Sequence, residues 1–149
     1  MSDELADPKS KLILVVEDDA PARDLLELCV KNEGFSVETA ASGTEALKKA
    51  AARTPDLIIL DFMLPGVGGY EVAKELQSGD AAGVPIFFIT GRHLDRQTSE
   101  MLRNEPNVKE YIEKPVKPAV LGSLLHRQLG TQPPSISRKL DRGPMSSGW

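Results

Sequence analysis

Residues able to hold a cation and a phosphoryl group stand where four apolar runs of this sequence end. In chain order these residues are Glu17, Asp18, Asp61, Thr90 and Lys114. If the runs are parallel strands of one sheet, their carboxyl ends meet at a single edge, which is where ligands of such sheets bind. Carboxylate oxygens suit a hard cation such as Mg²⁺. A hydroxyl and an ammonium group suit a phosphoryl group.

The acidic residues predict a cation site. Glu17 and Asp18 are adjacent, and neighbouring carboxylates repel each other unless they share a cation or a proton. Asp61 is expected to project into the same space, so that Asp18 and Asp61 bind Mg²⁺ directly and Glu17 acts through a water. Taken alone, the first acidic segment could be only a loop and a helix cap. The polar residues at the other strand ends favour the cation site.

Asp61 is the candidate nucleophile, because a carboxylate can accept a phosphoryl group and form an acyl phosphate. Charge on a transferring phosphoryl group is spread over its equatorial oxygens, so positioning and electrostatics dominate its transfer. Mg²⁺, the Lys114 ammonium and the Thr90 hydroxyl could each stabilise one oxygen. A lysine before Pro115 could also be a solvated turn when it is considered by itself.

Five strand patterns alternate with five helix patterns and would carry these residues. We expect strands at 11–16, 35–39, 57–60, 85–90 and 109–113, and helices at 20–33, 42–53, 70–78, 94–104 and 117–129. Such alternation predicts an α/β fold, a doubly wound five-stranded parallel sheet with helices on both faces and right-handed crossovers.

Apolar residues at helical spacing predict the buried faces of the first and last helices. The expected inward residues are Leu25, Leu26, Cys29 and Val30 in the first helix and Val120, Leu121, Leu124 and Leu125 in the last. Cys29 is the single cysteine, so the chain holds no internal disulfide. The two histidines, His93 and His126, show no ligand spacing and are expected at the surface.

Composition places the expected fold at 11–130, with an N-terminal extension at 1–10 and a flexible, proline- and serine-containing tail at 131–149. The net charge is −4, and the tail holds more basic than acidic residues, so the body is more acidic still. An acidic body argues against direct nucleic-acid binding, which needs a basic footprint. No stretch approaches the roughly 18 apolar residues of a membrane span. We therefore expect no membrane insertion and a cytoplasmic location.

Four motifs in this order resemble the receiver domain of bacterial two-component response regulators, in particular the stand-alone receivers of the chemotaxis-regulator type. The motifs are Val16-Glu17-Asp18-Asp19, Asp61-Phe62-Met63-Leu64-Pro65, Ile89-Thr90-Gly91 and Tyr111-Ile112-Glu113-Lys114-Pro115. Each is weak alone, whereas all four with compatible spacing are specific. The resemblance covers about residues 11–130 and implies the flavodoxin-like arrangement of the sheet.

The resemblance also implies roles for individual residues. Asp61 would be phosphorylated by a histidine kinase or a histidine phosphotransfer protein, and the chain would assist its own phosphorylation and dephosphorylation without turning over a separate substrate. The remaining implied roles are Glu17 and Asp18 as the acidic metal pair, the Met63 carbonyl as a further metal ligand, Thr90 as the switch hydroxyl, Lys114 as the partner of the phosphate, and Tyr111 as the aromatic switch. The face formed by 94–104, 109–113 and 117–129 would contact an unknown output protein.

Two segments depart from the usual pattern of the family. Gly68 stands where many members have an acidic residue, and 103–108 replaces a turn of small residues, which leaves the choice of output partner open. Met63 lies two residues past Asp61, and Arg92 lies two residues past Thr90. Neither side chain can accept a proton from the water that would hydrolyse the aspartyl phosphate, which predicts a long-lived phosphorylated form. Two other functions remain alternatives: a degenerate receiver that only binds proteins, and a phosphatase on a similar fold. The phosphatase needs an acid two residues past Asp61, where Met63 stands.

Overall fold

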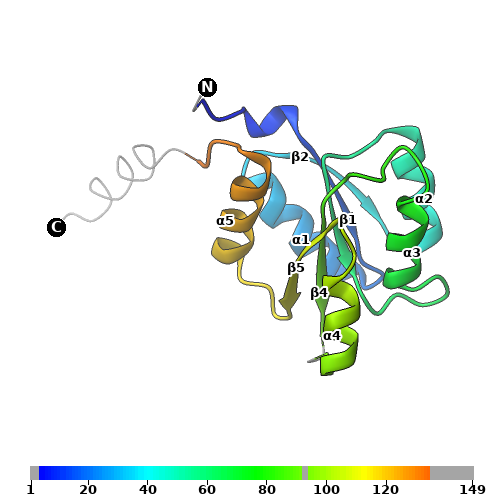
Figure 1. The fold of residues 1–149 in the computed structure, drawn as a ribbon. Coiled ribbons are helices and arrows are strands. Elements are labelled where there is room, and N and C mark those ends of the chain that lie inside the picture. The colour runs from blue at the N-terminus through cyan, green and yellow to red at the C-terminus, as the bar shows by residue number, and fades with distance from the viewer. Residues whose placement is uncertain (1–3, 92–93, 135–149) are drawn as a thin grey trace.

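A computed structural model describes residues 4–91 and 94–134 of the 149-residue chain. One sheet of five parallel strands has the order β2-β1-β3-β4-β5 (Figure 1). The strands are β1 (Leu12–Val16), β2 (Ser36–Ala40), β3 (Leu57–Asp61), β4 (Ile86–Thr90) and β5 (Val108–Glu113). The helices are α1 (Ala20–Asn32), α2 (Gly43–Ala52), α3 (Gly69–Leu76), α4 (Arg96–Arg103) and α5 (Pro118–Leu129), and a short 3₁₀ helix, η1 (Pro8–Ser10), precedes β1.

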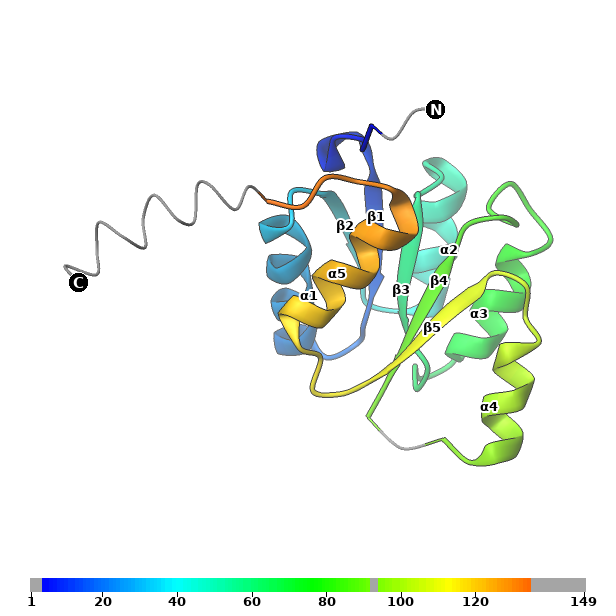
Figure 2. The same ribbon diagram turned by 60° about the vertical axis from the view of Figure 1, so that its left-hand side comes forward.

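Helices cover both faces of the sheet, as Figures 1 and 2 show. Helices α1 and α5 pack on one face over a core that includes Leu26, Val30, Leu121 and Leu125. Helices α2, α3 and α4 lie on the opposite face over a second core. The predicted α/β fold with a doubly wound parallel sheet is therefore confirmed.

The central strands are buried along their whole length, which explains their continuous apolar runs. All positions of β1, β3 and β4 are buried, as expected for parallel strands covered on both faces. The edge strands β2 and β5 are largely half-exposed and correspondingly more polar. Parallel pairing sets Val16 beside Leu60 and Asp61 beside Ile89, so the chain leaves these strands at one common edge.

Caps fix where several helices begin and end. The Asp19 side chain accepts a hydrogen bond from the Ala22 amide at 3.0 Å and starts α1. The Asp95 side chain caps α4 in the same way, so this helix begins at Arg96 rather than at the predicted residue 94. Helix α5 ends at Gly130, whose φ of 62° lies in the left-handed region that glycine adopts without strain.

Two residues predicted to be inward are exposed. Leu25 of α1 is 59% exposed and Val120 of α5 is 48% exposed, whereas their neighbours Leu26 and Leu121 are buried. Consecutive helical residues are separated by about 100° around the axis, so two adjacent apolar residues cannot both face the sheet fully. Leu26 and Leu121 face it, and Leu25 and Val120 therefore remain on the surface of α1 and α5.

His126 is buried, which corrects its expected surface position. The residue is 7% exposed, and its ring stacks on Phe35 with ring centroids 4.9 Å apart. Its Nε2 lies 2.9 Å from Oε1 of Glu33, and its Nδ1 lies 2.7 Å from Oγ1 of Thr131. The α5 helix therefore contributes a polar contact to α1 as well as an apolar one.

The start of the predicted tail belongs to the folded body. Thr131 is buried and pairs with Ala6 in a parallel bridge, and the Gln132 amide donates to the Ala6 carbonyl at 2.9 Å. Thr131 and Gln132 therefore contact the N-terminal segment of the chain. Arg92, His93 and the tail from residue 135 lie outside the described residues. None of the helices in the described part of the chain is long and apolar enough to cross a membrane.

Candidate cation and phosphoryl site

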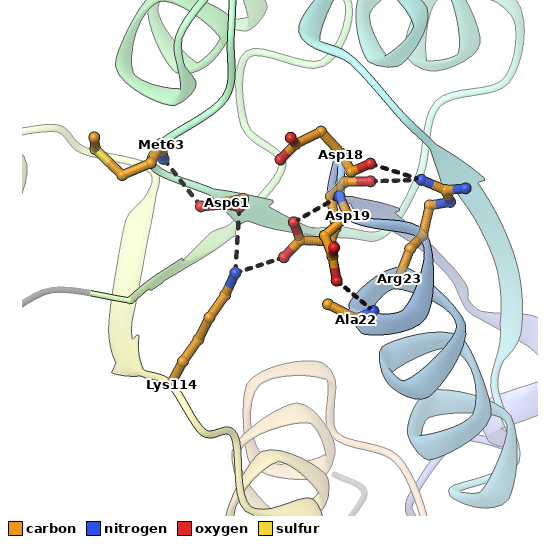
Figure 3. Close-up of polar contacts among 8 residues, drawn as sticks. Asp18, Asp19, Ala22, Arg23, Asp61, Met63 and Lys114 are labelled. Carbon is orange, nitrogen blue, oxygen red and sulfur yellow. Dashed lines mark hydrogen bonds and ion pairs between the residues drawn. The ribbon is translucent and has the colours of Figure 1, made fainter.

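Three carboxylates converge at the carboxyl edge of the sheet. Glu17 and Asp18 follow β1 and Asp61 ends β3, and one oxygen from each lies within 4.8 Å of the others (Figure 3). Glu17 is 1% exposed and Asp61 is 4% exposed, whereas Asp18 is exposed to solvent. The sheet register therefore brings together the acidic residues that the strand ends predicted, with one carboxylate open to solvent.

Lys114 lies against the two buried carboxylates. Its Nζ is 2.7 Å from Oε1 of Glu17 and 3.4 Å from Oδ2 of Asp61. The loop after β5 carries this lysine, and its amide donates to the Thr90 carbonyl at 2.8 Å. Burial acts to lower the pKa of Lys114, but the hydrogen bond to Glu17 and the charges of Asp61 and Glu17 outweigh it, so the pKa is raised. The ammonium form is therefore favoured in this site.

The Glu17 carboxylate is held on both of its oxygens. Oε1 accepts from Lys114, and Oε2 accepts from the Asp19 amide at 3.1 Å. Burial raises the pKa of Glu17, against the lowering by these two bonds, and the nearby Asp61 raises it further. Crowded, buried carboxylates of this kind gain stability from an added cation.

The loop after β3 approaches Asp61 closely. The Met63 amide donates to Oδ1 of Asp61 at 2.9 Å, and the Met63 side chain points away and is exposed (Figure 3). Gly69, the first residue of α3, packs against the same strand end: a Cβ atom there would lie 2.5 Å from the Asp61 carbonyl oxygen. A residue without a side chain is therefore required where α3 begins.

Thr90 and Tyr111 stand on neighbouring strands next to this edge. Thr90 is buried at the end of β4, with Glu113 of β5 as its pairing partner. The Tyr111 hydroxyl donates to the Ser99 carbonyl of α4 at 2.7 Å, and the Arg103 guanidinium lies 5.9 Å from the centre of the Tyr111 ring. Tyr111 thus joins β5 to α4 in this structure.

Sequence reasoning did not single out Arg23. Its Nη1 atom donates to the carbonyl oxygens of Glu17 at 2.9 Å and Asp18 at 3.4 Å. An arginine four residues after the capping Asp19 occupies the first turn of α1 and can reach back to the loop before the helix. That spacing was the signal that could have identified it.

The segment 103–108, which departs from the family pattern, contains a second polar cluster. Glu105 is nearly buried and accepts hydrogen bonds from Gln77 Nε2 at 2.8 Å and from the Tyr70 hydroxyl at 3.1 Å, with Lys74 Nζ at 3.4 Å. Gln77 Nε2 also donates to Oδ1 of Asn107 at 2.9 Å. The hydrogen bond from Gln77, followed by those from Tyr70 and Lys74, lowers the pKa of Glu105 against the effect of burial. This cluster ties α3 to the turn between α4 and β5.

The donor set at the sheet edge fits Mg²⁺. The three carboxylates supply hard oxygen ligands, and the exposed side of Asp18 leaves room for the waters that Mg²⁺ retains. A lysine and a buried hydroxyl complete the edge. A carboxylate nucleophile beside a cation site and an ammonium group is the arrangement that phosphoryl transfer to aspartate requires.

A five-stranded doubly wound sheet with this edge defines a phosphoaccepting signalling module. The family model of the response regulator receiver domain matches residues 13–126, and the chain belongs to that family. Its members serve as phosphoacceptors in two-component signal transduction.

Comparison with known proteins agrees with this assignment. The transcriptional regulatory protein AfsQ1 of Streptomyces coelicolor is 38% identical over 117 residues, which are 78% of this chain and 50% of AfsQ1. The DNA-binding response regulator MtrA of Mycobacterium tuberculosis is 35% identical over 123 residues, 83% of this chain and 52% of MtrA. The receiver domain of the sensor histidine kinase PA1611 of Pseudomonas aeruginosa has a TM-score of 0.72 at 29% identity, covering 81% of this chain and 98% of that domain. That structure holds a magnesium ion in its active-site cleft.

These relatives contradict the expectation of no direct nucleic-acid binding. That expectation was inferred from the acidic net charge of the chain, and the inference is wrong. MtrA is a DNA-binding response regulator, and the chain spans about half the length of MtrA and AfsQ1. The net charge of the matched half does not describe the remaining half of such proteins. A basic footprint is needed only on the face that meets DNA, so an acidic body excludes nothing about the whole molecule.

Proposed function

We propose that Asp61 accepts a phosphoryl group, with Mg²⁺ held by Glu17, Asp18, Asp61 and the Met63 carbonyl. The observation that supports this most strongly is the convergence of three carboxylates within 4.8 Å beside the Lys114 ammonium. Asp61 ends a buried strand and receives a hydrogen bond from the Met63 amide, so its carboxylate has a fixed direction. Fixed geometry of this kind is the main protein contribution to phosphoryl transfer.

In the proposed step, an Asp61 oxygen attacks the phosphorus of a phosphohistidine on a histidine kinase or a phosphotransfer protein. The new oxygen–phosphorus bond forms as the phosphorus–nitrogen bond breaks, and the imidazole leaves with the electron pair and takes up a proton. When bound, Mg²⁺ supplies positive charge to the phosphoryl oxygens and to the carboxylates. Lys114 and the Thr90 hydroxyl donate to the remaining oxygens. The chain is the acceptor in this reaction and turns over no separate substrate.

The donor is proposed to approach beside α1. Leu25 and Leu28 of α1 are exposed, and an apolar hollow of about 150 Å³ lies between α1 and the loop after β5. Leu25, Cys29 and Val116 are among its lining residues, and Lys114 and Glu17 of the site border the same hollow. An apolar surface that continues into the acceptor site fits the side of a donor protein that must bring its histidine to Asp61.

Phosphorylation is proposed to change the opposite side of the edge. If the Thr90 hydroxyl moves toward the phosphoryl group, it vacates space next to β5, and the Tyr111 ring moves inward from its bond to Ser99 of α4. The output partner would then recognise the altered α4–β5–α5 face. The bounds of the receiver domain, residues 11–130, stay a prediction. The cytoplasmic location also stays a prediction.

Intact-mass measurement tests the proposal. The parent protein is incubated with acetyl phosphate in the presence and absence of Mg²⁺, and the Asp61→Asn variant is treated alongside it. We expect a phosphoryl adduct in the parent only with Mg²⁺ and no adduct in the variant, because an amide is not a competent nucleophile here. If the parent acquires no adduct and beryllofluoride also fails to bind, the chain is a binding module rather than a phosphoacceptor.

A further inference from the structure

Arg23 contacts the backbone of the acidic loop rather than its carboxylates. The Nη1 atom of this residue donates to the carbonyl oxygens of Glu17 and Asp18 at 2.9 and 3.4 Å (Figure 3). The Arg23 amide donates to the Asp19 carbonyl at 2.8 Å, and the Asp19 side chain accepts from Ala22. One turn of α1 therefore holds three consecutive residues of the loop.

The two carboxylates of the acidic pair differ in how they are held. Glu17 is buried, and both of its carboxylate oxygens accept hydrogen bonds, from Lys114 and from the Asp19 amide. Within residues 4–91 and 94–134, no hydrogen bond or ion pair holds the Asp18 carboxylate, which is exposed. The direction of the Asp18 side chain consequently depends on its backbone.

Arg23 fixes that backbone on both sides of Asp18. Peptide groups are planar, so a held carbonyl fixes the orientation of the whole unit. The Glu17 carbonyl belongs to the peptide before Asp18, and the Asp18 carbonyl belongs to the peptide after it. With both oxygens bound by one guanidinium, the Cα–Cβ bond of Asp18 has a set direction, and its carboxylate comes within 4.8 Å of those of Glu17 and Asp61.

We infer that Arg23 is a positioning residue for the cation site, orienting the Asp18 carboxylate through the backbone. This inference rests on the proposed binding of Mg²⁺ by the three carboxylates. The guanidinium is planar and permanently charged, so the two N–H groups of its Nη1 atom point in fixed directions, one to each carbonyl oxygen. A positive charge near a cation site by itself weakens cation binding. Positioning by Arg23 would strengthen Mg²⁺ binding, whereas its charge would weaken it. Removing Arg23 therefore shows which of the two effects on Mg²⁺ affinity is larger.

Calorimetric titration of Mg²⁺ at constant ionic strength tests the inference on Arg23→Met, Arg23→Lys and the parent. Arg53→Met serves as the matched control, because Arg53 is exposed at the end of α2, away from the site. We expect Arg23→Met to bind Mg²⁺ roughly 10–100-fold more weakly, as is usual when a group that orients a metal ligand is lost. Arg23→Lys keeps the charge but replaces the planar guanidinium with a freely rotating ammonium group, so its Mg²⁺ affinity should fall between those of the parent and Arg23→Met.

A second measurement separates positioning from general damage to the fold. In phosphorylation by acetyl phosphate, Arg23→Met should need more Mg²⁺ for half-maximal rate, while its rate at saturating Mg²⁺ approaches that of the parent. If Arg23→Met does not fold, Arg23→Lys decides the matter by the same readouts. Unchanged or tighter Mg²⁺ binding by the folded variants would overturn the inference and leave the proposed function standing. Absence of Mg²⁺ binding by the parent would overturn both.

Discussion

The Nζ atom of Lys114 lies closer to Glu17, at 2.7 Å, than to Asp61, at 3.4 Å. The ammonium group therefore pairs mainly with the carboxylate that is not the proposed nucleophile. In this arrangement Lys114 offsets the repulsion between two buried acids while no cation is bound. If Mg²⁺ binds as proposed, it would take over that task and would leave the lysine available to a phosphoryl oxygen.

Lys114→Gln should destabilise the protein chiefly when Mg²⁺ is absent. Removing the ammonium leaves buried charged groups poorly paired, which costs about 1–3 kcal/mol. Saturating Mg²⁺ should reduce this difference, because the cation neutralises the same carboxylates. Urea unfolding of parent and variant with and without Mg²⁺ measures both effects. Lys48→Gln, at an exposed position of α2, is the control. An equal loss of unfolding free energy in Lys114→Gln with and without Mg²⁺ would contradict the idea that the cation replaces Lys114 as the partner of the carboxylates.

The sequence predicted which side chains would lie together, because the ends of parallel strands meet at one edge of the sheet. Glu17, Asp61, Thr90 and Lys114 each follow an apolar run, and parallel strands must deliver those positions to one edge. No contact with a distant residue was needed for that inference. The α/β alternation could be read for the same reason, since it depends only on local periodicity.

The features that escaped prediction depend on contacts between distant segments. His126 is buried because Glu33, Phe35 and Thr131 contact it. Glu33 and Phe35 are far from it in the sequence, and Thr131 lies beyond the end of α5, so the helical pattern of α5 does not reveal these contacts. The sequence shows only that the segment containing Glu105 departs from the family pattern, whereas Tyr70 and Lys74 of α3 and its C-cap residue Gln77 donate to the Glu105 carboxylate. Partners of buried polar groups follow from tertiary packing, which a local pattern does not encode.

Leu25 and Leu28 should matter for a protein donor and not for a small one. Replacing both with Ser removes exposed apolar contact area without adding charge near the cation site. We expect phosphotransfer from a histidine kinase or phosphotransfer protein that labels the parent to slow about tenfold, the factor given by ~1.4 kcal/mol of lost contact energy. Labelling by acetyl phosphate should be unchanged, because a small donor needs no docking surface.

Leu5→Ser provides the control for this pair, because Leu5 is similarly exposed but lies on the N-terminal segment. Initial rates with both donors are compared for all variants. A uniform slowing with both donors would point to damage at the site instead of lost docking. No slowing with the protein donor would show that it approaches from another side.

Glu105→Gln should alter the pH dependence of stability. The pKa of Glu105 is lowered in the folded protein, so its charge contributes stability above the unfolded pKa of about 4.3. That contribution is lost as the pH falls through the lowered folded value. At pH 7 the variant should be less stable by about 1–2 kcal/mol, since it loses hydrogen bonds to a charged acceptor.

Urea unfolding of parent and Glu105→Gln between pH 7 and strongly acidic pH tests this prediction. The two free energies of unfolding should converge at the acidic end. Glu75→Gln, an exposed change on α3, should follow the parent throughout. A constant difference between parent and Glu105→Gln at every pH would show that the carboxylate charge is not what holds α3 to the α4–β5 turn.

Thr90→Val should uncouple phosphorylation from the movement of Tyr111. Valine keeps the shape of threonine but lacks the hydroxyl that the phosphoryl group is proposed to attract. With beryllofluoride bound, the bond from the Tyr111 hydroxyl to Ser99 should be lost in the parent and kept in the variant. Crystal structures or side-chain NMR of both proteins show the ring position. The same Tyr111 position in free and beryllofluoride-bound parent would exclude this residue as the switch.

The most direct test of the central claim is to locate the phosphoryl group on the chain. The Mg²⁺- and acetyl phosphate-treated protein is reduced with borohydride, which converts an aspartyl phosphate to homoserine, and its peptides are then sequenced by mass spectrometry. The account predicts homoserine at position 61 and at no other aspartate. Homoserine at Asp18 or Asp19 with residue 61 unmodified would contradict it.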